Sequence, residues 1–180
     1  KQSFQHAHVD VPARIATACA KHPFKAFVHV SALGVEDSQA KYPQTKLEGE
    51  KAVQANFPIA TILRPSVVVG AGGDFFHKFA QMARYAQALP LIGGGETKFQ
   101  PVFVGDVADA AIQCLDDSAT QGKVYYLGGP EKVTVKESYA RLFEYTGRKR
   151  LLVTLSYTIA NVKARLISFL PVPPLSMEKV

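Results

Sequence analysis

The sequence predicts an α/β fold in which at least part of the sheet is parallel. An apolar run over 24–31 is followed by a helical pattern over 41–56 and by a second apolar run within 59–69. Two strands joined through a helix by short connections form a crossover unit, in which the strands are parallel. The chain has 180 residues, of which 47% are hydrophobic and 20% charged. This composition is typical of a soluble globular protein with a sizeable core.

A helix is predicted over 10–22, before the first strand. Asp10 can cap its start and Pro12 suits its first turn. An apolar stripe at helical spacing is expected to face the core and consists of Val11, Ile15, Ala18 and Cys19. The helix over 41–56 is expected to bury Leu47, Val53 and Phe57.

The second half of the chain alternates further helices and strands. We predict helices over 74–89, 107–115, 135–146 and 157–170, strands over 98–104 and 123–127, a glycine-rich loop over 90–95 and a turn at 128–130. Asp106 is expected to cap the second of these helices, and Gly147 to close the third. The last helix stops at Pro171-Val172-Pro173-Pro174.

Tyr42 and Lys46 are the first candidates for chemistry. A spacing of four residues places both side chains on one face of a helix, so the ammonium of Lys46 can lower the pKa of the phenol and favour proton transfer. Such pairs are also common on solvated helix faces, and that interpretation stays open. The preceding strand ends in Ser31, which favours the interpretation as a site.

Other polar residues near these strands have simpler interpretations. His29 lies on an apolar strand and is expected to be a core histidine with satisfied hydrogen bonds. Arg64 could contact a phosphate or pair with a carboxylate. The run Gly70–Gly73 follows a strand and opens a helix, but a dinucleotide phosphate loop would need glycine where Phe75 stands. We therefore interpret the run as a surface turn.

Charge and cysteine content narrow the possible partners. The net charge is +6, but the basic residues are scattered except for Arg148-Lys149-Arg150, so no nucleic-acid partner is expected. Cys19 and Cys114 are far apart and are interpreted as buried free thiols, and no metal site is expected. The sequence also shows no transmembrane stretch and no signal or transit peptide at its start.

Several motifs together resemble the extended or atypical short-chain dehydrogenase/reductases and, among them, the NAD(P)H-binding accessory subunits of mitochondrial complex I. They include FVHVSALG, YPQTKLEGEKAV, ILRPSVVVG, LPLIGGGETKFQPVFVGDVADA and GKVYYLGGP. The resemblance implies the C-terminal part of a Rossmann-like doubly wound parallel sheet with a small interleaved α/β lobe. Residues 1–73 would form the second half of the NAD(P)-binding domain and 74–180 mainly the lobe, with 98–127 partly returning to the sheet. The first strands and the glycine-rich loop are expected outside this chain.

The resemblance also assigns roles to individual residues. Ser31, Ala32 and Leu33 would face the nicotinamide half of the cofactor, Tyr42 and Lys46 would match the family tyrosine and the lysine that binds the ribose, and Pro65 and Ser66 would close over the nicotinamide. NADPH is the expected cofactor. NAD(H) stays open, because the residue that selects between the two would lie outside this chain.

The function implied is that of an accessory subunit of complex I without independent catalytic activity, in which bound NADPH supports assembly and stability. Its partners would be other complex I subunits, a companion segment with the N-terminal half of the domain, and anionic lipid. It would be peripheral on the matrix side of the mitochondrial inner membrane. Two alternatives are an independent NADP-dependent reductase or epimerase that uses Tyr42 and Lys46, and a nucleotide-sensing binding module.

Overall fold

The computed structural model describes residues 3–71, 73–156 and 158. The chain divides into two compact units. The first combines residues 1–66 with 102–128, and the second combines 67–101 with 129–180. Each unit contains its own buried apolar cluster.

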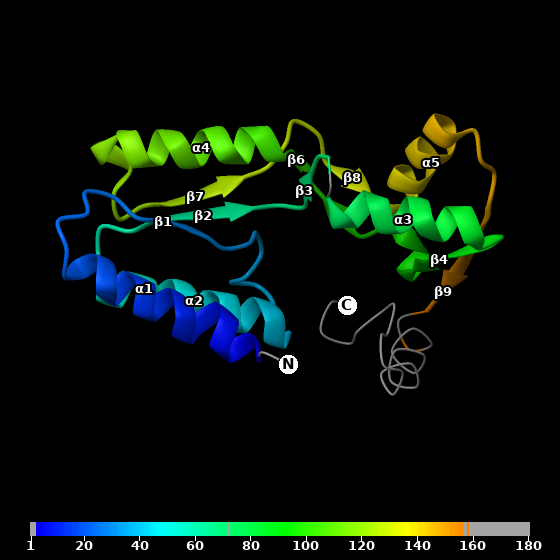
Figure 1. The fold of residues 1–180 in the computed structure, drawn as a ribbon. Coiled ribbons are helices and arrows are strands. Elements are labelled where there is room, and N and C mark those ends of the chain that lie inside the picture. The colour runs from blue at the N-terminus through cyan, green and yellow to red at the C-terminus, as the bar shows by residue number, and fades with distance from the viewer. Residues whose placement is uncertain (1–2, 72, 157, 159–180) are drawn as a thin grey trace. The chain divides into compact units, whose positions relative to one another are not determined.

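A parallel sheet forms the centre of the first unit. Its strands are β1 (Val28–Val30), β2 (Thr61–Pro65) and β7 (Val124–Leu127), in the order β1-β2-β7 (Figure 1). Both pairings are parallel, which confirms the predicted crossover. All five residues of the central strand β2 are buried, as expected for a parallel sheet covered on both faces.

Helices cover the two faces of this sheet. The helices α1 (Val11–Ala20) and α2 (Lys41–Asn56) lie on one face and α4 (Val104–Asp116) on the other (Figure 1). The strand β6 (Val102–Phe103) precedes α4, and a short 3₁₀ turn, η3 (Ser118–Thr120), follows it. The core between the sheet and the first two helices consists of Ala16, Val53, Phe57, Ala60 and Ile62. This layering confirms the predicted doubly wound α/β fold.

The N-terminal helix differs from its prediction. A π-helical turn, η1 (His6–Asp10), continues directly into α1, and Asp10 has helical backbone angles and makes no capping hydrogen bond. Val11 and Ile15 of the predicted buried stripe are exposed, whereas Ala16 is fully buried. Ala16 faces α2 because its single methyl group permits close packing with Val53. Val11 and Ile15 lie on the exposed side, whereas Cys19 of the predicted stripe packs against this core.

The bounds of α2 agree with the prediction, but its buried face is more polar than expected. Val53 is buried and Leu47 half-buried, and the same helix also buries Thr45, Gly49 and Glu50. A side chain at position 49 would place its Cβ only 1.9 Å from the carbonyl oxygen of His8. Glycine is therefore required where η1 crosses α2.

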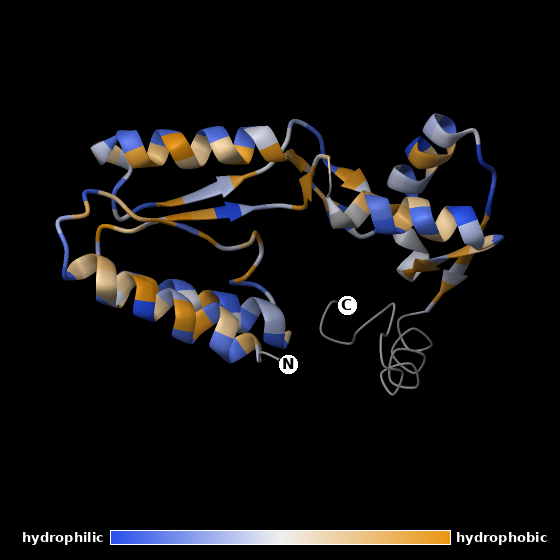
Figure 2. Ribbon diagram, viewed as in Figure 1, coloured by the Kyte–Doolittle hydropathy of each residue, from blue (hydrophilic) through white to orange (hydrophobic). Residues whose placement is uncertain are grey.

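The second unit contains two small sheets and two helices. The parallel pair consists of β4 (Ala88–Ile92) and β9 (Leu151–Leu155), and the antiparallel pair of β5 (Lys98–Phe99) and β8 (Val133–Thr134). The remaining elements are β3 (Val68–Val69), α3 (Asp74–Tyr85), the 3₁₀ turn η2 (Gly93–Gly95) and α5 (Val135–Thr146). Figure 2 shows apolar residues along β4, and its buried residues Leu89 and Leu91 join Ala83 and Tyr139 in the core.

Several predicted boundaries in the second half of the chain are wrong. The helix predicted over 74–89 ends at Tyr85, and 88–92 is a strand because it pairs with β9, a strand that was not predicted. Pro90 fits in β4 because, among the described residues, this strand pairs along one edge only. The single strand predicted over 98–104 is divided into β5 and β6.

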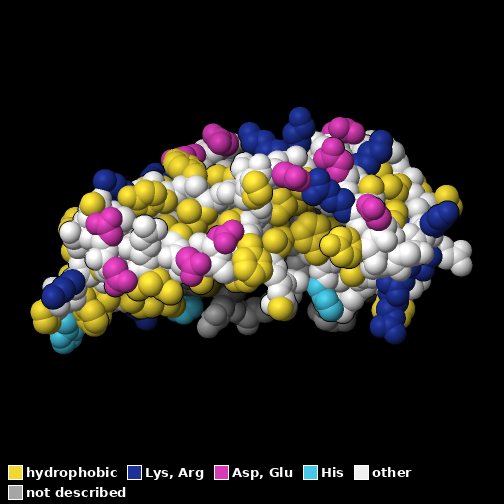
Figure 3. Space-filling model, turned by 90° about the horizontal axis from the view of Figure 1, so that it is seen from above, with side chains coloured by type: hydrophobic (Ala, Val, Ile, Leu, Met, Phe, Trp, Pro, Cys, Tyr) yellow, Lys and Arg dark blue, Asp and Glu magenta, His cyan; other side chains and the backbone are white. Residues whose placement is uncertain are grey.

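The predicted capping role of Asp106 is also wrong. The helix α4 begins at Val104, so Asp106 lies within its first turn and makes no capping hydrogen bond. A carboxylate there is still favourable to the helix dipole. Figure 3 shows acidic and apolar side chains mixed over α4, and the large apolar residues of this helix that are exposed are Val104, Ile112 and Leu115.

The helix α5 agrees with its prediction over the full range. Thr134 and Glu137 form a reciprocal capping box at its start, and Gly147 ends it with a left-handed φ of 64°. Cys114 is buried and Cys19 half-buried, both as free thiols. The helix predicted over 157–170 lies outside the described residues, except for position 158.

Candidate functional site

The predicted nicotinamide-facing residues lie together at the carboxyl ends of β1 and β2. Beyond β1, the amide of Ser31 donates to the carbonyl of Leu63 at 2.7 Å, and that of Leu33 donates to Pro65 at 2.9 Å. The amide of Ser66 donates to Leu127 at 2.8 Å, next to the end of β7. This edge is where open α/β sheets bind their ligands.

Ser31 and Lys46 provide polar groups at this edge. Ser31 is 5% exposed, and its Oγ has no hydrogen-bond partner among the described residues. The ammonium of Lys46 reaches over from α2 and donates to the carbonyl of Val30 at a long 3.4 Å. Burial lowers the pKa of Lys46, and the nearby carboxylate of Glu50 partly opposes this shift. A buried hydroxyl without a partner and an ammonium with one long hydrogen bond suit a polar ligand.

Tyr42 lies within a cluster of rings from the N-terminal segment. Its ring packs edge-to-face against His8, with centroids 5.1 Å apart, and against Phe4 at 5.7 Å. His8 also approaches Thr45, with 2.8 Å between Nδ1 and Oγ1, and burial lowers the pKa of His8. The close crossing at Gly49 positions these rings.

The predicted effect of Lys46 on Tyr42 is not found. Burial raises the pKa of Tyr42, because it disfavours the charged phenolate. In the part of the chain that the structure describes, no hydrogen bond joins Tyr42 to Lys46 or to Ser31. Tyr42 is therefore a neutral phenol in this arrangement.

His29 is half-buried on β1, but its hydrogen bonds are not satisfied as predicted. Its Nε2 is inaccessible to solvent and has no partner within the described ranges. Burial, with a smaller contribution from Lys46, lowers the pKa of the imidazole. His29 is therefore a neutral histidine below the strand ends.

Arg64 pairs with carboxylates, so its guanidinium is not left free to contact a phosphate. Two of its nitrogens donate to Glu50, with Nη2 at 2.6 Å and Nε at 3.0 Å. Its Nη1 lies 2.8 Å from Glu36 and donates to the hydroxyl of Tyr126, also at 2.8 Å. Figure 2 shows a hydrophilic segment within the otherwise apolar strand β2. These contacts resolve the alternatives that the sequence left open for Arg64.

The Arg64 network holds the loop after β1 against the sheet. Glu36 belongs to this loop, Glu50 to α2 and Tyr126 to β7. Hydrogen bonding to Glu50 raises the pKa of Arg64, and hydrogen bonding to Arg64 lowers the pKa of Glu36. None of these three partners was predicted from the sequence. Glu50 follows Lys46 by four residues, and this spacing could have indicated that its side chain faces the sheet.

Two other features bear on the site. The amide of Gly73 donates to the carbonyl of Gly70 at 3.0 Å, and the exposed Gly70 and Ala71 form part of a turn before α3, which agrees with the predicted surface turn. Among the residues described, there is no group of metal-ligating side chains and no helix long and apolar enough to cross a membrane.

Comparison with known families gives a match over most of the chain. The family described as the RmlD substrate binding domain matches residues 1–164. This range includes all of the first unit, most of the second and every predicted site residue.

Several relatives are subunits of mitochondrial NADH dehydrogenase. The chain is 34% identical over 165 residues to the mitochondrial NADH dehydrogenase [ubiquinone] 1 alpha subcomplex subunit 9 of Arabidopsis thaliana, covering 90% of this chain and 41% of the relative. It is 31% identical over 173 residues to the subunit of the same name from Mus musculus, covering 95% and 46%. The chain thus spans less than half the length of these relatives.

A solved structure shows the same fold. UDP-glucuronic acid 4-epimerase from Bacillus cereus, in complex with NAD, matches with a TM-score of 0.74 over 87% of this chain and 59% of the epimerase. The sequences are 20% identical, so this likeness concerns the fold alone.

Proposed function

Because the chain belongs to the RmlD substrate binding domain family, we propose that the strand ends of its first unit hold a nicotinamide dinucleotide and that it serves as part of an accessory, non-catalytic subunit of respiratory complex I. The observation that carries the proposal is the buried hydroxyl of Ser31, which has no partner among the described residues and directly follows Val30, whose carbonyl accepts from the ammonium of Lys46. The identity to subunits of NADH dehydrogenase supports the second part.

The residues at the strand ends fit such a ligand. Lys46 would hold the ribose hydroxyls, because an ammonium with one long hydrogen bond can donate two more. Ser31, Ala32 and Leu33 would face the nicotinamide, and Pro65 with Ser66 would cover it. When bound, a nicotinamide cofactor can exchange a hydride. NADPH remains our preference over NAD(H).

Tyr42 favours a structural use of the nucleotide. A phenol with a raised pKa, packed edge-on against His8 and Phe4, is a poor proton donor or acceptor at neutral pH. The chain would then keep the nucleotide as a structural element that supports assembly. The runner-up is an independent reductase or epimerase with Tyr42 as the proton donor, and the fold shared with an NAD-bound epimerase supports it.

The first test measures nucleotide that is released from the purified assembled complex. We expect Lys46→Ala and Ser31→Ala to lower nucleotide occupancy, and Lys51→Ala, an exposed lysine on the same helix, to leave it unchanged. Tyr42→Phe is expected to leave ubiquinone reduction nearly intact. A loss of turnover on the order of 10²-fold in an assembled Tyr42→Phe complex would support the catalytic alternative.

We further propose a peripheral position on the matrix side of the mitochondrial inner membrane, with other complex I subunits as partners. A companion segment with the N-terminal half of the domain would pair with β1, which lies at an edge of the described sheet. Anionic lipid would contact Arg148 and Lys149. Arg150 is already engaged, because its Nε donates to the carbonyl of Ala83 at 2.8 Å.

This position can be tested by charge reversal. We expect Arg148→Glu with Lys149→Glu to weaken retention on membranes during high-salt washing, because each basic residue near an anionic surface contributes about 1 kcal/mol. Arg150 is left unchanged so that the contact with α3 stays intact. Unchanged retention of the double variant would argue against lipid contact through this surface.

A further inference from the structure

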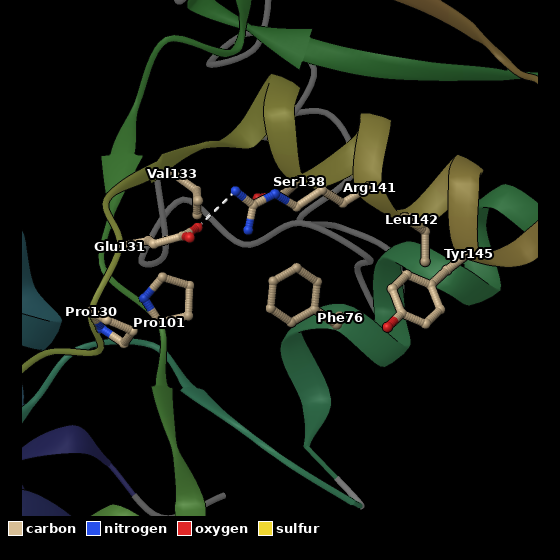
Figure 4. A pocket seen from close by; sticks show the side chains of 9 residues that line it. All are labelled: Phe76, Pro101, Pro130, Glu131, Val133, Ser138, Arg141, Leu142 and Tyr145. Carbon is tan, nitrogen blue, oxygen red and sulfur yellow. Dashed lines mark hydrogen bonds and ion pairs between the residues drawn. The ribbon is translucent and has the colours of Figure 1, made fainter.

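The second unit contains an open groove of ≈ 420 Å³ that the proposed nucleotide site does not use. Its lining is mainly aromatic, aliphatic and proline side chains: Phe76, Pro101, Pro130, Glu131, Val133, Ser138, Arg141, Leu142 and Tyr145. Figure 4 shows the ring of Phe76 between Pro101 and Tyr145. All of these residues belong to the second unit.

One face of α5 forms a wall of this groove. Ser138, Arg141, Leu142 and Tyr145 follow one another at helical spacing on that face. Tyr145 is 94% exposed, although its side chain is large and mainly apolar. Arg141 and Glu131 form an ion pair of 2.8 Å at the rim, with both side chains more than half exposed. The groove therefore has an apolar centre and a charged, solvated rim.

Grooves lined by aromatic rings are typical binding sites for proline-rich segments in the polyproline II conformation. Such segments lose little conformational entropy on binding, and residues three apart lie on the same edge of the helix. This chain has a segment of that kind, Pro171-Val172-Pro173-Pro174. Its first and last prolines have the three-residue spacing that lets both contact one groove.

The segment follows the last described strand of the second unit in the sequence, and the connection is long enough to reach the groove. The last described strand, β9, ends at Leu155, and fourteen residues (157–170) separate Ser156 from Pro171. An extended chain of this length spans at most about 50 Å, and a helical one about 20 Å. A short tether gives an effective concentration in the mM range, so a weak site is sufficient.

We propose that the groove formed by α5, Pro101 and Pro130 binds the chain's own segment Pro171–Pro174. Pro171 and Pro174 would contact the rings of Phe76 and Tyr145, and the ion pair between Arg141 and Glu131 would flank the bound segment. This contact anchors the C-terminal part of the chain to the second unit. It does not depend on the proposed nucleotide site.

The chain has no tryptophan, so a single tryptophan can report on the segment. In the full chain with Val172→Trp, we expect blue-shifted emission and several-fold weaker acrylamide quenching than in urea. Adding Tyr145→Ser is expected to shift the emission to that of exposed tryptophan. Tyr85→Ser is the matched control, because Tyr85 is also an exposed tyrosine in the last turn of a helix of this unit but lies outside the groove.

A second measurement avoids the tryptophan. In the otherwise unaltered chain, Pro171→Ala with Pro174→Ala is expected to shift the ring resonances of Tyr145 in NMR spectra and to leave those of Tyr85 in place. The proposal is overturned by an emission of the Val172→Trp chain equal to that in urea, by an emission that does not respond to Tyr145→Ser, or by unchanged Tyr145 resonances. Emission that moves to the red on dilution would assign the groove to a second copy of the chain and overturn binding within one chain.

Discussion

The two units of this chain have cores of different chemistry. The first contains an ion pair between Arg64 and Glu50, both under 5% exposed, beside an apolar cluster. The core of the second is built around Tyr139, which is 1% exposed and packs against the ring of Phe79 with a centroid distance of 4.8 Å. A buried ion pair adds little net stability, and we expect this one to fix the positions of the elements that it joins. The buried ion pair therefore lies in the first unit, where Arg64 also holds the loop after β1 through Glu36, next to the candidate site.

The largest expected effect comes from breaking the charged core. Glu50→Ala leaves the guanidinium of Arg64 buried without its main partner, and we expect a loss of about 3–5 kcal/mol in the free energy of unfolding. Urea denaturation measures this loss. The control Glu48→Ala, on the exposed side of the same helix, is expected to change stability by less than about 0.5 kcal/mol. Equal midpoints for the two variants would contradict the role of the ion pair.

Removing the aromatic centre of the second unit is expected to cost about 3 kcal/mol. Tyr139→Ala leaves a cavity between Phe79, Phe143 and Leu89. The loss should be local, so amide hydrogen exchange is expected to accelerate in β4 and α5 while protection in β2 is retained. Equal acceleration in β2 would show that the two cores unfold together.

Gly49→Ala probes the crossing of η1 over α2. In an open helix this change would stabilise the protein by up to about 1 kcal/mol. Here the new methyl group would collide with the backbone of His8, and we expect a net loss of about 1–2 kcal/mol. Near-ultraviolet circular dichroism of the rings around Tyr42 should change as well. A more stable variant with an unaltered spectrum would rule out the close crossing.

The smallest effect is a pH dependence at the edge of the charged core. Hydrogen bonding to Arg64 lowers the pKa of Glu36 in the folded chain. The contribution of Glu36 to stability is therefore complete above its unfolded pKa, about 4.3, and is lost as the pH falls through the lower folded value. The stability difference between the original chain and Glu36→Gln should shrink between about pH 5 and pH 3. A constant difference over this range would be inconsistent with the pair.

The sequence predicted the first unit better than the second, for a physical reason. The bounds of α2 and the parallel pairing of β1 with β2 follow from patterns within 40 residues of chain. The strand β4 pairs with β9, where Ala88 meets Leu151 across 63 positions. Neither strand has a local signal strong enough to identify it, and Pro90 argued against the first.

The positions of the candidate site residues in the fold were predictable from the sequence, but their electrostatics were not. Ser31 and Lys46 could be identified from their places on a strand end and a helix. The raised pKa of Tyr42 could not, because it depends on burial near two rings, His8 and Phe4, from a segment more than thirty positions away. Arg64 could not be assigned because its partners come from three different elements.

The interleaving of the two units constrains the order in which the chain can fold during synthesis. The strand β7 completes the first sheet, but it follows 67–101, which belong to the second unit. That segment therefore leaves the ribosome before the first unit can close, and its own partner strand β9 is made later still. Until β7 and β9 have emerged, the apolar faces of β2 and β4 can be covered only by temporary contacts. Nascent chains with such exposed apolar surface recruit chaperones.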